Sequence, residues 1–266
     1  MRSCHLVCRS TGETFSAREP RWCSPQGELL DLVVVPHLEP SLLPNRPHTL
    51  WRYRERLPID RDEHIITLAE GCTPILAITI DGVPVMVKQE QLFPTGSYKD
   101  RGAAVLMSKV RELGISHVVQ DSSGNAGCAI AAYAAAAAVG CEIFVPELTS
   151  PAKLLQIEAY GARLHKIPGE RQAAAEAALA ASRTSYYASH VWNPFFLHGT
   201  KTFAYEVWEQ LAGRIPDAIV VPVGNGTLLL GAFIGFTELL EMNLIERMPR
   251  LFRSEEHTSE LQSPNT

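Results

Sequence analysis

Short apolar runs alternate with segments of helical spacing from about residue 75 onward. The runs that predict strands are PVMVK (84–88), HVVQD (117–121), EIFVP (142–146), ARLHKI (162–167) and AIVVPV (218–223). Helical spacing or composition marks the stretches 103–113, 126–139, 152–160, 170–183 and 199–212, and the apolar segment 227–242 predicts a buried helix. This order of elements predicts an α/β fold with parallel sheets that are covered by helices on both faces.

The first 70 residues follow a different pattern, because seven prolines fall between Pro20 and Pro58. Proline interrupts helices and central strands, so we expect an extended arm rather than long regular elements. The predicted organisation is an N-terminal arm (1–27), a larger α/β domain (28–100 plus 191–252) and a smaller α/β domain (101–190). The chain thus leaves the larger domain and returns to it.

The end of the sequence differs in kind from the rest. The segment RSEEHTSELQS (253–263) resembles an in-frame translation of a sequencing-library adapter. It has no periodic apolar face that could dock on a core. We therefore predict that residues 253–266 are a non-native tail.

Composition and charge exclude several classes of function. The chain has 24 basic and 29 acidic residues, a formal charge of −5 and no dense basic block, so nucleic acid is not an expected partner. An apolar run of transmembrane length and a secretory signal are both lacking, which predicts a cytoplasmic protein without a membrane partner. Six cysteines in 266 residues do not suggest a disulfide framework.

Three segments carry candidate chemistry. Two are glycine-containing loops between a predicted strand and a predicted helix, DSSGNAG (121–127) and GNGT (224–227), where backbone N–H groups favour an anion. Neither has the glycine spacing of a dinucleotide site or a P-loop. The third is FPTGSYKDRG (93–102), in which Lys99 fits either a solvated turn or a buried amine.

Together these segments resemble a known family. PTGSYKDRG, SSGNAG, NPFFLHGTKTFAYE and VPVGNGT occur in the order seen in the threonine synthase branch of the fold-type II (tryptophan synthase β-like) pyridoxal-phosphate enzymes. The likeness covers about residues 71–231. It implies two parallel-sheet α/β domains of that fold and pyridoxal 5'-phosphate as the cofactor.

The resemblance also implies roles for individual residues. Lys99 would be the catalytic residue that bonds covalently to the cofactor, and a neutral amine at this position needs burial or nearby positive charge. The remaining cofactor-binding residues would be Asn125, Gly224, Asn225, Gly226 and Thr227. The substrate α-carboxylate would be held by Ser122, Ser123, Gly124 and Ala126. Tyr98 stands where phenylalanine is more usual in this branch.

A threonine synthase must also bind the phosphate of O-phosphohomoserine, which it converts with water to threonine and phosphate in threonine biosynthesis. Lys153 and Lys201 are candidates for this contact, and helix-surface lysines are the alternative. A serine/threonine dehydratase or another fold-type II lyase would need no second phosphate site. A non-catalytic protein that binds a small phosphorylated metabolite is a further alternative.

The N-terminal cysteines and the missing C-terminal part complete the expectations. Cys4, Cys8 and Cys23 resemble the zinc-ribbon-like arm of some threonine synthases, but Gln26 stands near the fourth position, so a degenerate arm without metal is expected. The family's chain continues past the phosphate loop, which implies that this chain is a C-terminally truncated, inactive fragment. For the full-length protein we expect a small, phosphorylated amino-acid substrate, and a homodimer is one form open to it.

Overall fold

The computed structural model describes residues 4–35 and 37–254. The chain divides into two compact units, residues 1–200 and 201–266, and each is considered by itself. The division into an arm, a larger domain and a smaller domain stays a prediction. Most of the predicted non-native tail, residues 255–266, lies outside the described residues, whereas Arg253 and Ser254 end a strand.

The N-terminal part of the first unit is a small antiparallel sheet followed by short 3-10 helices. Strands β1 (Cys4–Cys8), β2 (Thr14–Ser16) and β3 (Leu30–Val34) pair in the order β2-β1-β3. The helices that follow are η1 (Pro40–Asn45), η2 (Leu50–Arg56), η3 (Asp62–His64) and η4 (Glu90–Leu92). The prolines thus have the expected effect, since no helix in the described part of the first 70 residues exceeds 7 residues.

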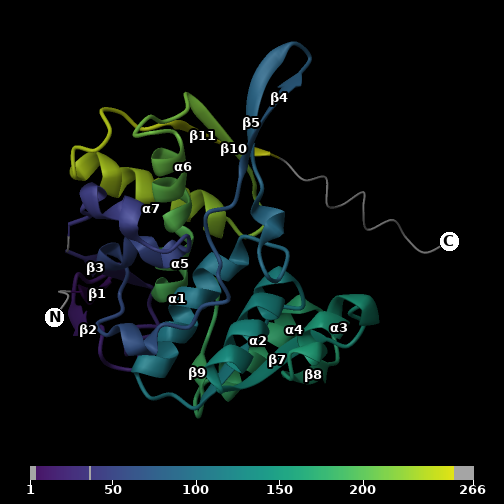
Figure 1. Cartoon of the computed structure of the whole chain (residues 1–266). Helices are drawn as coiled ribbons and strands as arrows, with labels where there is room; N and C mark the ends of the chain where they lie inside the picture. The colour runs from purple at the N-terminus through teal and green to yellow at the C-terminus, as the bar shows by residue number, and fades with distance from the viewer. Residues whose placement is uncertain (1–3, 36, 255–266) are drawn as a thin grey trace. The chain divides into compact units, whose positions relative to one another are not determined.

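A four-stranded parallel sheet organises the rest of the first unit (Figure 1). Its strands are β6 (His117–Gln120), β7 (Gly140–Pro146), β8 (Arg163–Ile167) and β9 (Tyr186–Tyr187), in the order β8-β7-β6-β9. The connecting helices are α2 (Asn125–Ala137), α3 (Pro151–Ala159) and α4 (Arg171–Ala181). Val119 and Tyr187 pack on one face with Ala178 of α4, while Val118 belongs to the main core with α2. The predicted α/β fold, a parallel sheet with helices on both faces, is confirmed.

Helices α1 (Lys99–Glu112) and α5 (Pro194–Thr200) pack closely against each other. A Cβ atom on Gly102 would lie 2.3 Å from the Phe196 ring, and one on Gly199 would lie 2.0 Å from the Arg101 carbonyl oxygen. Both positions therefore require glycine. The contact brings α5, which follows the parallel sheet in sequence, against the helix that begins with Lys99.

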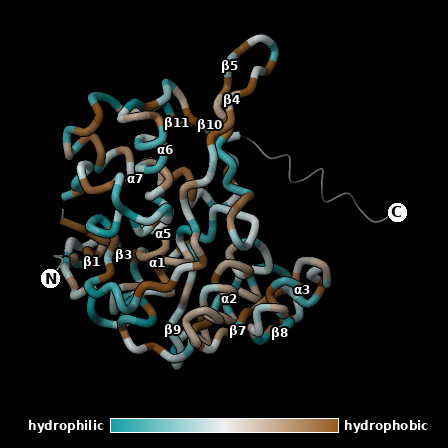
Figure 2. The backbone as a smooth tube through the Cα atoms, viewed as in Figure 1, coloured by the Kyte–Doolittle hydropathy of each residue, from teal (hydrophilic) through white to brown (hydrophobic). Residues whose placement is uncertain are grey.

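The strand predicted at 84–88 exists, but it does not join a parallel sheet. Strand β5 (Val83–Lys88) pairs with β4 (Ile75–Ile80) as an antiparallel hairpin, and within the described residues neither pairs with another strand. Asp81 and Gly82 form the connection with positive φ angles of 49° and 79°, as a tight two-residue hairpin turn requires. Figure 2 shows hydrophobic segments along this hairpin.

The second unit contains a β-α-β arrangement. Strands β10 (Ala218–Pro222) and β11 (Arg250–Ser254) are parallel, and α7 (Thr227–Glu241) connects them. Helix α6 (Thr202–Gln210) packs on α7. The helix predicted at 199–212 corresponds to α6, while α5 is a separate helix that ends at Thr200. None of the helices in the described part of the chain is long and apolar enough to cross a membrane.

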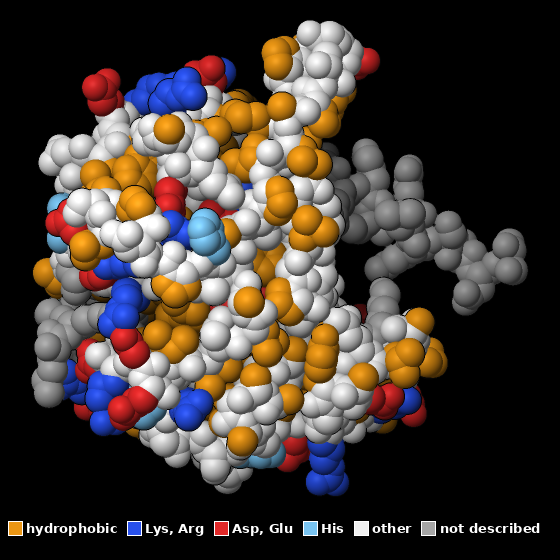
Figure 3. Space-filling view, viewed as in Figure 1, with side chains coloured by type: hydrophobic (Ala, Val, Ile, Leu, Met, Phe, Trp, Pro, Cys, Tyr) orange, Lys and Arg blue, Asp and Glu red, His pale blue; other side chains and the backbone are white. Residues whose placement is uncertain are grey.

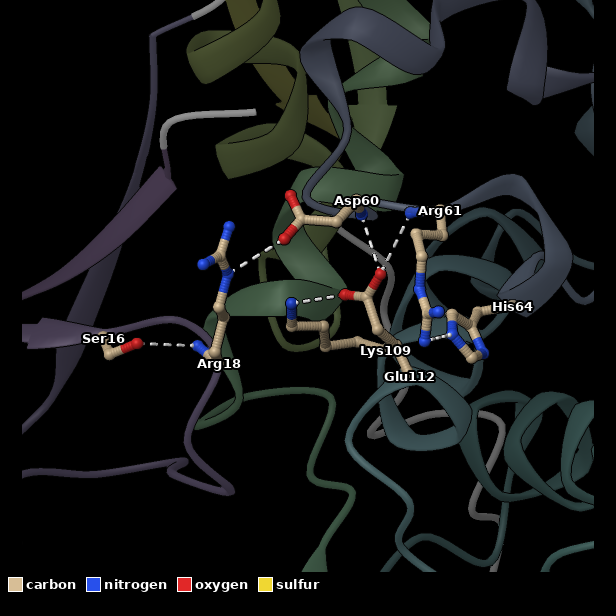
Figure 4. Close-up of polar contacts among 7 residues, drawn as sticks. All are labelled: Ser16, Arg18, Asp60, Arg61, His64, Lys109 and Glu112. Atoms are coloured by element: carbon tan, nitrogen blue, oxygen red, sulfur yellow. Dashed lines mark hydrogen bonds and ion pairs between the residues drawn. The ribbon is translucent and has the colours of Figure 1, made fainter. Parts of the chain in front are cut away.

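A polar network joins the N-terminal segment to the C-terminal end of α1 (Figure 4). The Glu112 carboxylate accepts hydrogen bonds from the backbone N–H groups of Asp60 (2.7 Å) and Arg61 (3.2 Å), and Lys109 Nζ donates to it at 2.7 Å. Arg18 Nε in turn lies 3.0 Å from Asp60 Oδ2. One carboxylate on α1 thus satisfies two backbone donors of a segment without long regular structure.

Candidate active site

The segment that leads to Lys99 is a tight loop. Gly96 has a φ of 83°, which favours glycine, and its N–H donates to the Phe93 carbonyl at 2.8 Å. The Ser97 hydroxyl accepts from the Lys99 N–H at 3.3 Å, and α1 begins at Lys99. The loop and the helix start therefore define where the lysine side chain leaves the backbone.

Asp100 and Arg101, the charged neighbours of Lys99, form hydrogen bonds with the segment that precedes α1. The buried Asp100 carboxylate accepts from the Thr95 N–H at 2.9 Å and from the Thr95 hydroxyl. Burial raises the pKa of Asp100 to about 6, while the Thr95 hydrogen bonds oppose that rise. Arg101 makes two hydrogen bonds of 2.8 Å to Glu90. Asp100 therefore uses its carboxylate to hold the loop, and Arg101 binds the segment that precedes it.

The Lys99 amine is buried among aromatic groups. The residue is 7% exposed, and its Nζ lies 4.7 Å from the centre of the Tyr98 ring and 5.8 Å from that of Phe196. Burial lowers the pKa of Lys99 to about 7. A large fraction of the amine is therefore neutral near neutral pH, and a neutral amine is the form that attacks a carbonyl carbon. The alternative of a solvated surface lysine is wrong.

The first predicted anion loop lies between β6 and α2. Ser122 and Ser123 are half-buried, Gly124 and Asn125 are exposed, and α2 begins at Asn125. The first N–H groups of a helix have no intrahelical partner and attract negative charge. Gly127 is required here, because a Cβ atom would lie 2.0 Å from the Ser122 carbonyl oxygen. The loop can therefore fold back onto the first turn of α2. Ala126, the last predicted carboxylate-binding residue, is buried in that turn.

The structure adds one residue that the sequence reasoning missed. His190 is 6% exposed and follows β9, and its ring meets Phe196 edge to face with the ring centres 6.1 Å apart. Burial lowers the pKa of His190 to about 3, with a further contribution from the nearby Lys99 charge. Strand β9 has only two residues, so no periodic signal marked the turn that follows it.

The second predicted anion loop belongs to the second unit. Gly226 has a φ of 85° and precedes α7, which begins at Thr227. The Asn225 side-chain oxygen accepts from the Thr227 hydroxyl at 3.1 Å. Among the described residues, and apart from the glycine's own chain neighbours, no atom lies within 4 Å of a Cβ position on Gly224 or Gly226, so this loop presents its backbone in open space. It has the features of a phosphate-binding helix start.

The two lysines predicted to bind the substrate phosphate have different surroundings. Lys153 lies in the first turn of α3, and its side chain is outside the described part of the structure. Lys201 is fully buried, and its Nζ lies 2.8 Å from Glu238 on α7. The Tyr205 hydroxyl also donates to Glu238. The ammonium of Lys201 is therefore already used to join α6 and α7.

Two of the three cysteines of the N-terminal segment lie on one extended strand. Cys4 and Cys8 are the two ends of β1, so three residues lie between them and their Cα atoms are about 13 Å apart. Ligands of one zinc ion lie much closer together than this. In the described residues, no group of three or more His, Cys, Asp or Glu side chains is placed to hold a metal ion.

Comparison with known proteins agrees with this chemistry. Residues 66–256 match the family described as "PALP: Pyridoxal-phosphate dependent enzyme". A threonine synthase from Methanocaldococcus jannaschii is 32% identical over 257 residues, which cover 92% of this chain and 63% of that protein. The chain thus spans less than two thirds of the length of this relative.

Solved structures extend the comparison. The serine racemase of Dictyostelium discoideum matches with a TM-score of 0.60 and 29% identity, over 71% of this chain and 61% of that one. The cysteine synthase of Entamoeba histolytica matches with a TM-score of 0.63 and 22% identity, over 78% of this chain and 65% of that one, and shows the fold alone. The chain belongs to the pyridoxal-phosphate dependent enzyme family.

The residues present fit this cofactor. The buried amine of Lys99 suits a covalent bond to an aldehyde, and its lowered pKa supplies the neutral form. The exposed glycine backbone before α7 suits a phosphate, since its N–H groups can approach an anion without a side chain in the way. Asn125, at the start of α2, carries an exposed amide that can meet a ring hydroxyl.

Proposed function

We propose that the chain carries the reactive lysine of a threonine synthase, a pyridoxal-phosphate lyase that forms threonine and phosphate from O-phosphohomoserine and water. The observation that carries this proposal is the buried, low-pKa amine of Lys99 at the start of α1. The 32% identity to a threonine synthase over 257 residues supports the choice of substrate. The racemase and cysteine synthase neighbours support only the broader class.

The residues of the two loops divide the binding work. Ser122, Ser123 and the first N–H groups of α2 would receive the carboxylate of an amino-acid substrate, because this helix start favours a negative charge. The N–H groups of the loop 224–227 would receive the cofactor phosphate for the same reason. Each loop would bind one anion, and neither would use the amine of Lys99, which stays available for the reacting carbon.

Lys99 would also move protons. Pyridoxal phosphate, when bound, withdraws electrons from the substrate Cα and so makes its proton acidic. The Lys99 Nζ can accept that proton because burial favours its neutral form, and it can return a proton later in the same turnover. The Tyr98 and Phe196 rings beside Nζ exclude water from this position.

The first experiment tests whether Lys99 holds the cofactor. The purified chain, mixed with pyridoxal phosphate and dialysed, should keep the visible absorption band of a lysine-bound cofactor. Lys99→Ala should lose the band, and Lys166→Ala, which removes an exposed lysine on β8, should keep it. The absence of a band in the unmutated chain would contradict the proposal and leave a non-catalytic binder of a phosphorylated metabolite as the alternative.

A serine/threonine dehydratase is the second candidate, and one observation favours it. Lys201, one of the two lysines predicted to bind a substrate phosphate, is buried in an ion pair with Glu238. A substrate without phosphate would not need it. The assay uses the full-length protein, because this chain is expected to be an inactive fragment, and it compares phosphate release from O-phosphohomoserine with 2-oxo acid formation from threonine or serine. Only the second product would support the dehydratase.

A further inference from the structure

His190 lies beside the loop that begins with Ser122. Val119 of β6 pairs with Tyr187 of β9 in parallel register, and the Ala188 N–H continues the pairing by donating to the Val119 carbonyl at 2.9 Å. The Gln120 side chain also donates to the Ala188 carbonyl at 2.8 Å. Strands β6 and β9 therefore end side by side. His190 follows the end of β9, next to the point where the loop 121–127 (the serine loop) follows the end of β6.

The His190 ring and the Lys99 amine both lie beside the Phe196 ring. Phe196 is fully buried, and it contacts the His190 ring edge to face while its centre lies 5.8 Å from Lys99 Nζ. Gly102 permits this arrangement because the Phe196 ring occupies the space of a side chain there. His190 and Lys99 thus border the same aromatic ring, in the same unit of the chain.

One ring nitrogen of His190, Nδ1, is buried and has no hydrogen-bond partner among the described residues. Burial and the charges of Lys99 and Arg171 lower the pKa of His190, and the Asp121 charge opposes them only partly. The imidazole is therefore neutral at physiological pH, with one N–H donor and one acceptor nitrogen. A buried polar atom without a partner costs free energy, which a ligand that pairs with it would recover.

We propose that His190 determines specificity at the Lys99 site by forming a hydrogen bond from Nδ1 to a side-chain oxygen of the bound amino acid. The inference rests on the proposed function for its cofactor and amino-acid ligand. The ligand class is a small α-amino acid with a hydroxyl or ester oxygen on its side chain. A site with a buried hydrogen-bonding group rejects an analogue that lacks the matching oxygen, because the group is then left unpaired.

Threonine and valine provide the binding test, since they differ by a hydroxyl in place of a methyl group. The dissociation constants of both are measured by calorimetry on the cofactor-loaded chain. We expect threonine to bind about tenfold more tightly than valine, a factor typical of one hydrogen bond. His190→Leu should reduce this ratio to about one, whereas His190→Asn, which keeps a polar atom near the position of Nδ1, should retain most of it. The control is His165→Asn on β8.

A second measurement does not depend on a variant that folds. The ring nitrogens of 15N-histidine are followed by NMR in the unmutated chain during titration with threonine. The His190 signal should shift, and the His165 signal should not. An unchanged threonine to valine ratio in His190→Leu, or an unmoved His190 signal at the highest threonine concentration, would overturn the inference.

The two proposals can fail separately. Loss of the cofactor band only in Lys99→Ala, together with an unresponsive His190, would leave the enzyme proposal standing and remove the inference. A responsive His190, together with a full-length protein that releases no phosphate from O-phosphohomoserine, would leave the inference standing and remove the threonine synthase assignment.

Discussion

A charged Lys99 amine costs free energy in the folded chain, because the amine is buried. Burial lowers the pKa of Lys99 to about 7, against an ordinary value of 10.5 for lysine. Below about pH 7 the lysine is charged in both states, so folding must bury the whole charge. The cost falls as pH rises from about 7 to about 10.5, because the folded chain then binds fewer protons than the unfolded one, and above that range it vanishes.

The prediction is that Lys99→Met stabilises the chain without cofactor. At pH 6 we expect the free energy of unfolding to rise by at least about 1 kcal/mol, because a one-unit pKa shift corresponds to about 1.4 kcal/mol. The gain should shrink as pH approaches 10.5. Urea unfolding at several pH values measures it, with Lys166→Met as the exposed control. A gain that does not change with pH would contradict the electrostatic explanation.

Gly127 offers a second prediction at the same scale. Gly127→Ala would place a methyl group 2.0 Å from the Ser122 carbonyl oxygen, so the serine loop must move or α2 must shift. We expect a loss of stability of about 2 kcal/mol, as is usual for steric strain in a packed region. Thermal unfolding measures it. Gly124→Ala is the matched control, since nothing lies within 4 Å of its Cβ position, and equal effects of the two substitutions would contradict this reading.

Among the secondary-structure elements, α1 has a different task at each end. Its first residue is Lys99, and its last residue, Glu112, accepts hydrogen bonds from the backbone N–H groups of Asp60 and Arg61. Lys109 lies between them and is also bound to Glu112. The C-terminal end of α1, which is not part of the candidate site, therefore binds the N-terminal segment.

Glu112→Gln should loosen that segment. The substitution removes the charge that balances the buried Lys109, and we expect a loss of about 2 kcal/mol, since an uncompensated buried charge is costly. Hydrogen exchange of the Asp60 and Arg61 amides should become faster, while Glu158→Gln, at an exposed position of α3, should leave it unchanged. Unchanged protection in Glu112→Gln would show that other contacts hold the segment.

The elements that the sequence predicted well are those with a long periodic pattern. Helices α1, α2, α3 and α4 and strands β6, β7 and β8 follow the predicted ranges within a few residues. Strand β9 was missed because two residues carry no period, and α5 because NPFFLHG gives no polar face to a helix that is buried almost all round.

The residues of the candidate site also divide into those that a sequence pattern marks and those that only the structure shows. Lys99 and the loops before α2 and α7 were marked by glycines and by their order along the chain, so sequence patterns could find them. His190 could not be found this way, because its role depends on a contact with Phe196 and on an unpaired nitrogen. Lys201 was predicted from the sequence to bind a substrate phosphate, and only the structure shows that its amine is paired with Glu238.

At the scale of the whole molecule, the hairpin of β4 and β5 in the first unit carries several exposed apolar side chains. Ile78 is 42% exposed and Ile80 51%, and both lie on one face of β4 because they are two residues apart in the strand. Figure 3 shows hydrophobic side chains on the surface of this hairpin. Unpaired strand edges with apolar side chains promote association between chains. We therefore expect the double substitution Ile78→Thr and Ile80→Thr to reduce aggregation.

Light scattering during slow heating measures this effect. The onset of aggregation should move to a higher temperature in the double variant, while the unfolding midpoint should stay within about 2 °C, as expected for exposed positions. Leu148→Thr, at a residue that is 93% exposed outside the hairpin, is the control. An equal shift in the control would show that general surface polarity is responsible.

The contact of α1 with α5 has a consequence for how this site can change. Phe196 occupies the space that Gly102 leaves open, and the same ring borders both Lys99 and His190. A substitution at position 196 would alter the surroundings of the Lys99 amine and the His190 imidazole together, although neither residue would itself be replaced. Selection in the laboratory for a new substrate should therefore recover changes at Phe196 early, because one codon there adjusts the acidity of the amine and the reach of the imidazole at once.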